Sequence, residues 1–530
     1  MMRRFLLAAA VVGTAAGVLA REKIVLGHGW DTLDATPEDM LANAEAFDRT
    51  PFDGFTITLR NGKRPDGTKI DCLKMRGDAA WTPECFYGYD RTMRELVKHR
   101  SMKESMLVVY WGTGDRLAWQ DDEKWTAFAQ SMSAVATLAK RWNLPGIVID
   151  PEDYNRKNQY TRFKDDGDWA ELKRLARKRG RQMSEAIFTA YPKCRLLAFW
   201  TFSNIEPTWF QDPEKIVRSY YDLRPDFFNG LMDGLSAEGT IHDGDEMAYL
   251  ARADRNDFHF HAWRTKEGGR SMVATENMSK YDRQWRVSFG LYPDAHVRPL
   301  DRGWRFHREF DDLAPNALFS MNVEQALKAA DDMIWIYWEK GTLIRWKEKK
   351  FDCYAKNGLW DEQIPGFSSS VRYAKDVRGA LAADIASGAV KACADESQLK
   401  DEKGEGGLYK YLVVDGVQGG ETYGVRFKTK AKNPRVWVFW HADGKFKRDI
   451  WPVDIGVDEK PGADGRYEGA AVVRVPDRDG VEMRDNVTGI EVRLYADFEA
   501  TDLPEEVELK VYPILKAFRA KAEPGKDAKK

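Results

Sequence analysis

Two carboxylates, Asp150 and Glu152, stand out as candidate catalytic groups, in the segment Gly-Ile-Val-Ile-Asp-Pro-Glu-Asp-Tyr that begins at Gly146. On an extended chain, residues two apart point to the same side. Neighbouring carboxylates push each other's pKa values apart, so one can keep its proton at neutral pH. Such an acid protonates the leaving oxygen when a glycosidic bond is cleaved. We therefore expect acid–base chemistry here; the alternative is a solvated acidic loop.

Two more carboxylates follow strand-like segments. Phe228–Leu235 contains Asp233, which either ends a strand as a third catalytic group or merely starts an Asp-Gly turn. Met333–Trp338 is followed by Glu339, which we expect to accept hydrogen bonds from sugar hydroxyls; the alternative is a surface Glu–Lys pair. The loop that runs from Glu238 to Tyr249 holds further acids around Gly244, and acidic loops of this kind are usually only solvated: Asp243, Asp245 and Glu246.

Aromatic residues are abundant, with 19 Trp, 20 Tyr and 26 Phe. Most are expected in the core, but an aromatic ring at a strand end can stack on the apolar face of a sugar. The residues that we expect to bind substrate, together with Glu339, are Trp30, Asp31, Trp111, Tyr154, Trp200 and Trp338.

Short apolar segments alternate with helical patterns from about residue 21 to residue 366. The predicted strands are Ile24–Gly29, Phe52–Leu59, Met106–Trp111, Gly146–Asp150, Leu196–Trp200, Phe228–Leu235, Trp285–Leu291 and Met333–Trp338. Between them lie helical patterns, such as the capped start at Thr36-Pro37. Eight strands with intervening helices predict an α/β fold, the (β/α)8 or TIM barrel, whose active sites lie at the carboxyl ends of the strands. An open doubly wound sheet is the structural alternative.

The chain changes character after residue 366. Residues 367–408 read as a linker with one helix, Val371–Ile385. Residues 409–515 show only alternating strand patterns separated by turn signals, which predicts an all-β, jelly-roll-like sandwich. Residues 516–530 are rich in Ala, Lys and Pro and are expected to form a disordered basic tail.

The first 20 residues are typical of an export signal. A basic start is followed by the apolar run Phe5–Leu19, and Val18 and Ala20 satisfy the small-residue rule before a cut near Arg21. The apolar run is short for a membrane span, although an uncleaved anchor is the alternative. We therefore expect a secreted or periplasmic protein without a membrane span in the mature chain.

Composition limits the partners. The net charge is −2, from 82 basic and 84 acidic residues, which argues against a nucleic-acid binder. The five Cys are too scattered to suggest a zinc site or a disulfide framework, although Cys72 and Cys85 flank a short loop and could pair. We expect neither a metal nor another cofactor, and the oligomeric state stays open.

Two carbohydrate-enzyme families share short motifs with this chain. Residues 146–152 resemble the fourth-strand motif of family 18 glycoside hydrolases, which implies Glu152 as the acid and Asp150 as the residue that assists the substrate's N-acetyl group. The acidic positions that precede this pair in family 18 are Pro145 and Val148 here. The aspartates predicted on strands four and six are instead similar to those of α-galactosidase-type barrels, which implies Asp150 as nucleophile and Asp233 as acid.

A third resemblance concerns the C-terminal part, where residues 421–495 resemble a carbohydrate-binding module. Together these features lead us to expect a secreted glycoside hydrolase with a carboxylate acid–base mechanism at the barrel rim, acting on a poly- or oligosaccharide. The alternative is a non-catalytic glycan-binding barrel protein of the cell surface or periplasm. The sugar, its linkage and its anomer stay open.

Overall fold

The structure is a computed structural model. It describes residues 23–70, 75, 80–111, 116–152, 158–163, 166–205, 223–297, 314–404, 407–431, 433–442, 445–447, 453–476, 487–497 and 501–517. The predicted signal peptide and all but two residues of the predicted tail lie outside these ranges. Among the described residues, no helix is long and apolar enough to cross a membrane.

The N-terminal part of the chain forms one parallel sheet of nine strands, in the order β7-β6-β5-β4-β3-β2-β1-β9-β8. The strands are β1 (Ile24–Gly29), β2 (Gly54–Thr58), β3 (Met106–Tyr110), β4 (Gly146–Asp150), β5 (Arg195–Ala198), β6 (Thr240–Asp243), β7 (Trp285–Val287), β8 (Gly290–Leu291) and β9 (Met333–Trp338). Every residue of β1 and β2 is buried, as expected for strands covered on both faces. Because all pairs are parallel, the carboxyl ends of the strands gather at one rim.

One extended segment joins the two edges of this sheet. β7 pairs with β6, β8 pairs with β9, and only Ser288 and Phe289 separate β7 from β8. These two residues continue the hydrogen bonding, because Ser288 N–H donates to the carbonyl of Asp243 and Trp335 N–H donates to that of Phe289, each at 2.9 Å. β7 and β8 therefore act together as one strand of the barrel. The sheet closes into a (β/α)8 barrel. The predicted barrel is confirmed.

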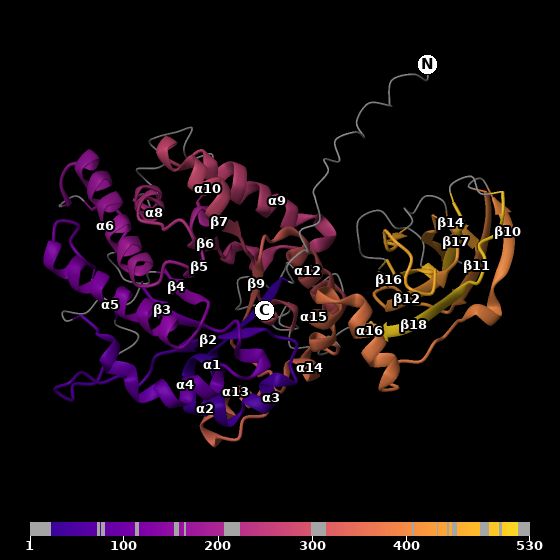
Figure 1. Ribbon diagram of the computed structural model, residues 1–530, viewed down its shortest axis with the longest axis horizontal. Coiled ribbons are helices and arrows are strands. Elements are labelled where there is room, and N and C mark those ends of the chain that lie inside the picture. Colours follow the sequence, from indigo (N-terminus) through magenta and orange to yellow (C-terminus); the bar gives the residue numbers. More distant parts are fainter. Residues whose placement is uncertain are drawn as a thin grey trace, which may run out of the picture.

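Helices surround the strands (Figure 1). They are α1 (Trp30–Asp34), α2 (Pro37–Ala42), α3 (Ala44–Asp48), α4 (Asp90–Leu96), α5 (Asp122–Arg141), α6 (Trp169–Ala190), α8 (Arg224–Asp233), α9 (Asp257–Trp263), α10 (Met278–Gln284), α11 (Asp294–Val297), α12 (Pro315–Ala329), α13 (Asp352–Ala355) and α14 (Trp360–Gln363). The predicted cap is present, since the Thr36 side chain accepts a hydrogen bond from Asp39 N–H at the start of α2. Two single-turn 3₁₀ helices, η4 (Phe202–Asn204) and η6 (Glu246–Leu250), follow β5 and β6.

The predicted sixth strand, Phe228–Leu235, is wrong, because this segment belongs to helix α8. Its apolar residues follow a helical spacing and are buried: Phe227, Phe228, Leu231 and Met232. α8 packs tightly on α6, and a Cβ on Gly230 would lie only 2.1 Å from the carbonyl oxygen of Arg177. The actual sixth strand, Thr-Ile-His-Asp, is short and largely polar, so it gives little strand signal.

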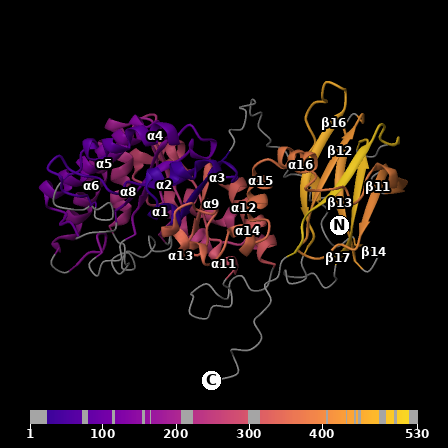
Figure 2. The same ribbon diagram turned by 90° about the horizontal axis from the view of Figure 1, so that it is seen from below.

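Two antiparallel sheets follow toward the C-terminus. Their strands are β10 (Lys400–Gly404), β11 (Gly407–Asp415), β12 (Thr422–Thr429), β13 (Arg435–Ala442), β14 (Lys445–Lys447), β15 (Val453–Ile455), β16 (Tyr467–Arg474), β17 (Val487–Tyr495) and β18 (Glu508–Leu515). One sheet has the order β10-β11-β17-β13-β14, with β15 paired to β13, and the other β16-β12-β18. Both sheets contribute to one core, in which Val425 and Val438 are fully buried. The predicted sandwich is confirmed, and Figure 2 shows it beside the barrel.

The connection between the two parts holds more structure than expected. α15 (Phe367–Lys375) and α16 (Val377–Ala386) replace the single predicted helix, and Asp376 separates them and caps α16 through a 2.9 Å hydrogen bond from Gly379 N–H. β10 lies within the predicted linker and pairs with β11, so the sheet begins before residue 409. Arg474 of β16 pairs with Glu324 of α12, which ties the sandwich to the barrel.

Candidate functional site

Asp150 and Glu152 lie together where β4 reaches the rim. Asp150 is the last residue of β4, and the backbone N–H of Glu152 donates a 2.9 Å hydrogen bond to Asp150 Oδ1. Both residues keep part of their surface exposed. Burial of the carboxyl group and then repulsion from Glu152 raise the pKa of Asp150 to about 7. The two carboxylates are thus electrostatically coupled, and Asp150 can keep a proton near neutral pH.

Strand alternation decides which residues face the barrel mouth. Asp150 pairs in register with Tyr110 at the end of β3. The next residue, Trp111, points the other way and packs on Phe128 of α5 and Phe227 of α8. Because side chains alternate along a strand, Tyr110 and its neighbour Asp150 face the barrel interior.

Three tyrosines form an aromatic wall beside this pair. Tyr249 of η6 stacks on Tyr337 of β9, with ring centroids 5.7 Å apart, and on Tyr292, which follows β8, at 5.1 Å. Tyr292 and Tyr337 also stack on each other, at 5.4 Å. The charge of Glu152 is among the causes that raise the pKa of Tyr249 above its usual value, after burial and the neighbouring Glu246 and Tyr337. This electrostatic contact places the wall near the carboxylate pair.

Trp30 and Glu339 meet at the same wall. Trp30 is 45% exposed, and its indole N–H donates a 2.6 Å hydrogen bond to the Tyr337 hydroxyl. That hydroxyl donates in turn to Glu339 Oε1 at 3.1 Å. The backbone N–H of Glu339 is held by Asp294 Oδ2 at 2.9 Å. The structure therefore brings these two predicted substrate-binding residues together at the rim.

Three other predicted sugar-stacking residues are buried, so the structure does not support that role for them. Trp111 is 3% exposed, Trp200 1% and Trp338 0%. The Arg224 guanidinium lies 5.1 Å from the centre of the Trp200 ring. A sugar needs an exposed ring face, and these rings pack against the protein instead.

Asp31 is a buried acceptor rather than a ligand for sugar. Its Oδ1 accepts hydrogen bonds from Trp338 Nε1 at 2.8 Å and from Thr32 N–H at 2.9 Å, and its Oδ2 accepts one from Trp346 Nε1 at 2.9 Å. Burial raises the pKa of Asp31 to about 6, although these hydrogen bonds oppose the rise. Asp31 thus has a structural role, because it joins α1 to Trp338 of β9 and to Trp346 in the loop after β9.

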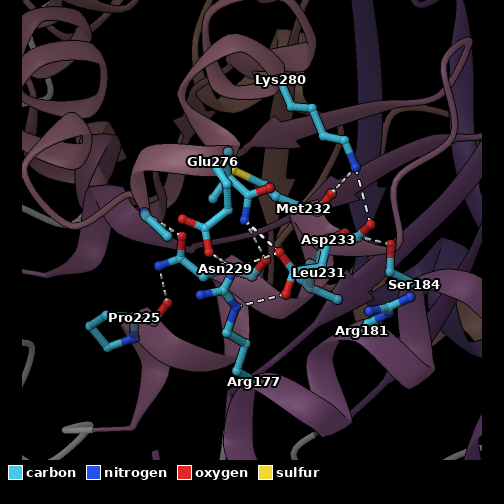
Figure 3. Close-up of polar contacts among 12 residues, drawn as sticks. Arg177, Arg181, Ser184, Pro225, Asn229, Leu231, Met232, Asp233, Glu276 and Lys280 are labelled. Atoms are coloured by element: carbon cyan, nitrogen blue, oxygen red, sulfur yellow. Dashed lines mark hydrogen bonds and ion pairs between the residues drawn. The ribbon is translucent and has the colours of Figure 1, made fainter. Parts of the chain in front are cut away.

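Asp233 lies away from the rim, because it is the last residue of α8 and not the end of a strand. Figure 3 shows it among Arg177, Asn229, Glu276 and Lys280. Arg177 donates two hydrogen bonds to its carboxylate, at 2.7 and 2.8 Å. Burial alone would raise the pKa of Asp233, but the bonds from Arg177 and Asn277 hold it below the usual value. The predicted catalytic role does not fit this closed ion pair between helices.

The true sixth strand ends in two other buried acids. Asp243 accepts hydrogen bonds from the backbone N–H groups of Thr201 and Ser203, at 3.2 and 2.9 Å, and so anchors the segment after β5. Asp245 has left-handed backbone geometry, with φ 38°, and its Oδ2 lies 2.7 Å from His261 Nδ1. Its Oδ1 is buried and has no hydrogen-bond partner among the described residues. A strained acidic residue at a strand end is a candidate for function.

The remaining expectations fall partly outside the described residues. Tyr154 and Cys72 both lie there, while Cys85 is a buried free thiol. In the described ranges, no group of three or more His, Cys, Asp or Glu side chains is arranged to hold a metal ion.

Neither a protein-family model nor a curated protein matches the chain. Among solved structures, one described as "Glycoside hydrolase" has 12% identity and a TM-score of 0.36, over 90% of this chain and 93% of that one. A Bacteroidetes-affiliated GH5 cellulase has 12% identity and a TM-score of 0.33, over 66% and 94%. A GH27 β-L-arabinopyranosidase from Geobacillus stearothermophilus has 8% identity and a TM-score of 0.33, over 89% and 97%. These neighbours are glycoside hydrolases, but the similarity is remote.

Proposed function

We propose that this protein is a glycoside hydrolase whose catalytic centre is the Asp150–Glu152 pair. The observation that carries the proposal is the position of these two residues together at the barrel rim, where burial and then the charge of Glu152 raise the pKa of Asp150 to about 7. Glycosidic cleavage needs both a proton donor and a carboxylate that stabilises or attacks the sugar cation. One protonated and one ionised carboxylate supply these two groups.

The pair acts as a proton-sharing unit. Burial and then the charge of Glu152 raise the pKa of Asp150 to about 7, so we propose Asp150 as the residue that holds the shared proton near neutral pH. Glu152 lies two residues beyond Asp150, on the segment that leaves the strand. Transfer of the proton from Asp150 to Glu152 then makes Glu152 the acid for the glycosidic oxygen.

The surrounding side chains suit a sugar. Trp30 offers an exposed indole face, and the Glu339 carboxylate beside it accepts hydrogen bonds from hydroxyl groups. The stacked Tyr249, Tyr292 and Tyr337 add aromatic surface near the pair. These contacts support an oligo- or polysaccharide as the substrate.

Asp245 takes the place of Asp233 as the third candidate carboxylate. It follows the actual sixth strand, and His261 lies beside it at hydrogen-bond distance. The α-galactosidase-type resemblance implies an acid at the end of strand six; Asp243 ends the actual strand, and Asp245 lies two residues beyond it.

The test of the proposed function is a binding screen of the purified full chain on a glycan array, followed by product analysis for each glycan bound. Cleavage of at least one bound glycan by the wild type, and its loss in Asp150→Asn, supports the proposal. Binding without cleavage at any pH from about 4 to 8 would instead support a glycan-binding protein.

We also propose that the protein is exported, on the basis of the basic start, apolar run and small-residue site in residues 1–20. Amino-terminal sequencing of the protein expressed in its host should give a mature chain that begins near Arg21. A mature chain that retains Met1 and the apolar run would contradict cleavage.

A further inference from the structure

Two aromatic side chains of α9, Phe260 and Trp263, are the most exposed large hydrophobic side chains among the described residues. Each is 57% exposed. They lie three positions apart and so share one face of the helix, and their ring centroids are 5.9 Å apart with an interplanar angle of 30°. Large apolar side chains that gather on the surface of a soluble protein mark candidate binding sites. We call these two residues the α9 aromatic pair.

The other side of α9 anchors the helix to the barrel. Phe258 is fully buried and packs edge-to-face on Phe289, which lies between β7 and β8, with ring centroids 5.5 Å apart. His261 Nδ1 lies 2.7 Å from Asp245 Oδ2. The aromatic pair is therefore carried by a fixed element, so little conformational entropy is lost when a ligand binds to it.

α9 lies at the same end of the barrel as the candidate catalytic pair. Asp245, which His261 contacts, lies two residues beyond the end of β6. η6 begins at the next residue and carries Tyr249, whose pKa is raised in part by the charge of Glu152. η6 thus lies between the carboxylates and α9 along this chain of contacts. A ligand that reaches both places must be an extended chain.

The exposed area of the α9 aromatic pair indicates the size of its ligand. An aromatic side chain buries about 150–250 Å² when it is fully covered, so the exposed part of both rings amounts to roughly 200–300 Å². A stable protein interface needs about 800 Å² per partner, which is far more. A sugar needs only an exposed ring face and polar groups beside it. His259 and Glu267, four residues before and after Trp263, are exposed and can bind hydroxyl groups.

The two basic residues that follow the α9 aromatic pair do not favour an anionic membrane as the ligand. Arg264 donates a hydrogen bond to the carbonyl of Ser203, and Lys266 Nζ donates one to the carbonyl of Trp285 at 2.6 Å. Both cations are directed to the protein, whereas binding to anionic lipid needs basic side chains that face outward.

We propose that the α9 aromatic pair is a second glycan-binding surface, separate from the catalytic centre, that stacks on the sugar rings of a polysaccharide. The identity of the ligand rests on the proposed glycosidase function, and the inference adds that the substrate is a polymer. A chain held at α9 raises the local concentration of its other segments at the barrel rim. A short oligosaccharide that occupies only the rim gains nothing from the pair.

Pull-down of the full chain on insoluble cellulose, xylan, mannan, starch and chitin, on ice, tests the proposal. We expect saturable binding of the wild type to at least one of these polymers. Phe260→Ala combined with Trp263→Ala should weaken that binding at least about tenfold, because both stacking faces are removed. The fold of this double variant should be intact, since both side chains lie on the surface, and thermal denaturation checks it.

Tyr87→Ala is the matched control. Tyr87 is also an exposed aromatic residue, at 37%, but its ring lies 4.4 Å from the guanidinium of Arg141. Arg141 ends α5 shortly before β4 begins, so this residue lies at the opposite end of the barrel from the rim. Its removal should leave the affinity for the polysaccharide unchanged.

Turnover separates this proposal from the proposed function. When the wild type cleaves the polymer that it binds, the double variant should lose about tenfold in rate at low polymer concentration, and it should keep the wild-type rate on a short oligosaccharide of the same sugar. Binding is measured without turnover. Absence of cleavage would therefore contradict the proposed function and leave the binding comparison valid.

Equal affinity of the folded double variant and the wild type for every polymer bound would overturn the proposal, and so would absence of binding by the wild type. Size-exclusion chromatography and sedimentation with phosphatidylglycerol vesicles are run alongside. Loss of an oligomer or of vesicle binding in the double variant, with polysaccharide binding unchanged, would assign the pair to a second copy of the chain or to lipid instead.

Discussion

The backbone N–H of Glu152 donates a hydrogen bond to Oδ1 of Asp150, at 2.9 Å, across the buried Pro151. This bond holds the turn by which the chain leaves β4 and keeps the Glu152 backbone beside the Asp150 carboxylate. A hydrogen bond to the ionised form should lower the pKa of Asp150, yet burial and the charge of Glu152 outweigh it. The pKa of Asp150 at the rim is therefore raised to about 7.

Glu152→Gln should cost roughly 10²–10⁴-fold in turnover on an unactivated glycan, because the amide cannot donate the proton to the leaving oxygen. Glycan affinity should stay close to that of the wild type, since the side chain keeps its shape. A substrate with an activated leaving group needs little protonation and should lose much less. Steady-state kinetics on both substrates check this, and an equal loss on both would remove Glu152 from the role of acid.

Asp150→Asn should stabilise the fold at neutral and alkaline pH. The folded pKa is raised from 3.8 to about 7, so the stability linked to this group is complete below pH 3.8 and is lost as the pH rises through 7. The amide carries no charge and avoids that loss. We expect Tm to rise by roughly 1–3 °C at pH 8 and to change little at pH 4. Thermal denaturation at both values is the measurement, and a variant less stable than wild type at pH 8 would contradict the raised pKa.

Asp233→Asn tests a carboxyl group whose pKa is lowered in the folded protein, whereas that of Asp150 is raised. The folded pKa of Asp233 is lowered, so its stabilisation is present above pH 3.8 and is lost as the pH falls through the folded value. Breaking the ion pair with Arg177 should cost about 1–3 kcal/mol at pH 7, and less as the pH drops below 3.8. Denaturant unfolding measures the cost. Turnover of the folded variant should match the wild type, and a large loss would restore Asp233 to the site.

Trp30→Ala should weaken glycan binding about 3–10-fold with little change in stability, because it removes an exposed stacking face. Trp338→Phe is the matched control, a substitution of a buried tryptophan. It removes the indole donor to Asp31 and should lower stability by about 1–3 kcal/mol while leaving glycan affinity intact. Titration calorimetry and unfolding of both variants separate the two roles. Unchanged affinity in Trp30→Ala would exclude the stacking contact.

Asp245→Asn tests the third carboxylate. Asparagine tolerates the left-handed backbone of this position, so the variant should fold. If Asp245 takes part in proton transfer, turnover should fall at least about tenfold at every pH. If Asp245 is purely structural, Asp245→Asn should lose stability but keep the wild-type turnover per folded molecule. A combined unfolding and rate measurement therefore decides between the two roles.

Much of the barrel could be predicted from sequence because its strands are nearly pure apolar runs. The bounds of β1, β4 and β9 agree with the predicted ones residue for residue. The sixth strand was missed because the most apolar run of that region, Phe228–Leu235, lies in a helix that is buried on both sides. The actual strand, β6, has four residues, three of them polar, and so gives a much weaker hydrophobic signal.

The proximity of Asp150 and Glu152 could be predicted because both residues lie in one short segment. Asp150 and Glu152 share a strand end, so their proximity follows from local geometry. Trp338 is buried for a different reason, because side chains alternate along β9 and Tyr337, not Trp338, stacks in the tyrosine wall. The wall of Tyr249, Tyr292 and Tyr337 joins three separate segments and has no local sequence signal.

The most direct test of the catalytic pair is the rate of sugar release from the best-bound glycan by four proteins: the wild type, Asp150→Asn, Glu152→Gln and the double variant. Two residues that share one proton act as a unit, so the double variant should lose about as much turnover as the worse single variant, roughly 10²–10⁴-fold. Folded Asp233→Asn, assayed alongside, should keep the wild-type rate. Sugar release by the double variant at the wild-type rate would contradict the account.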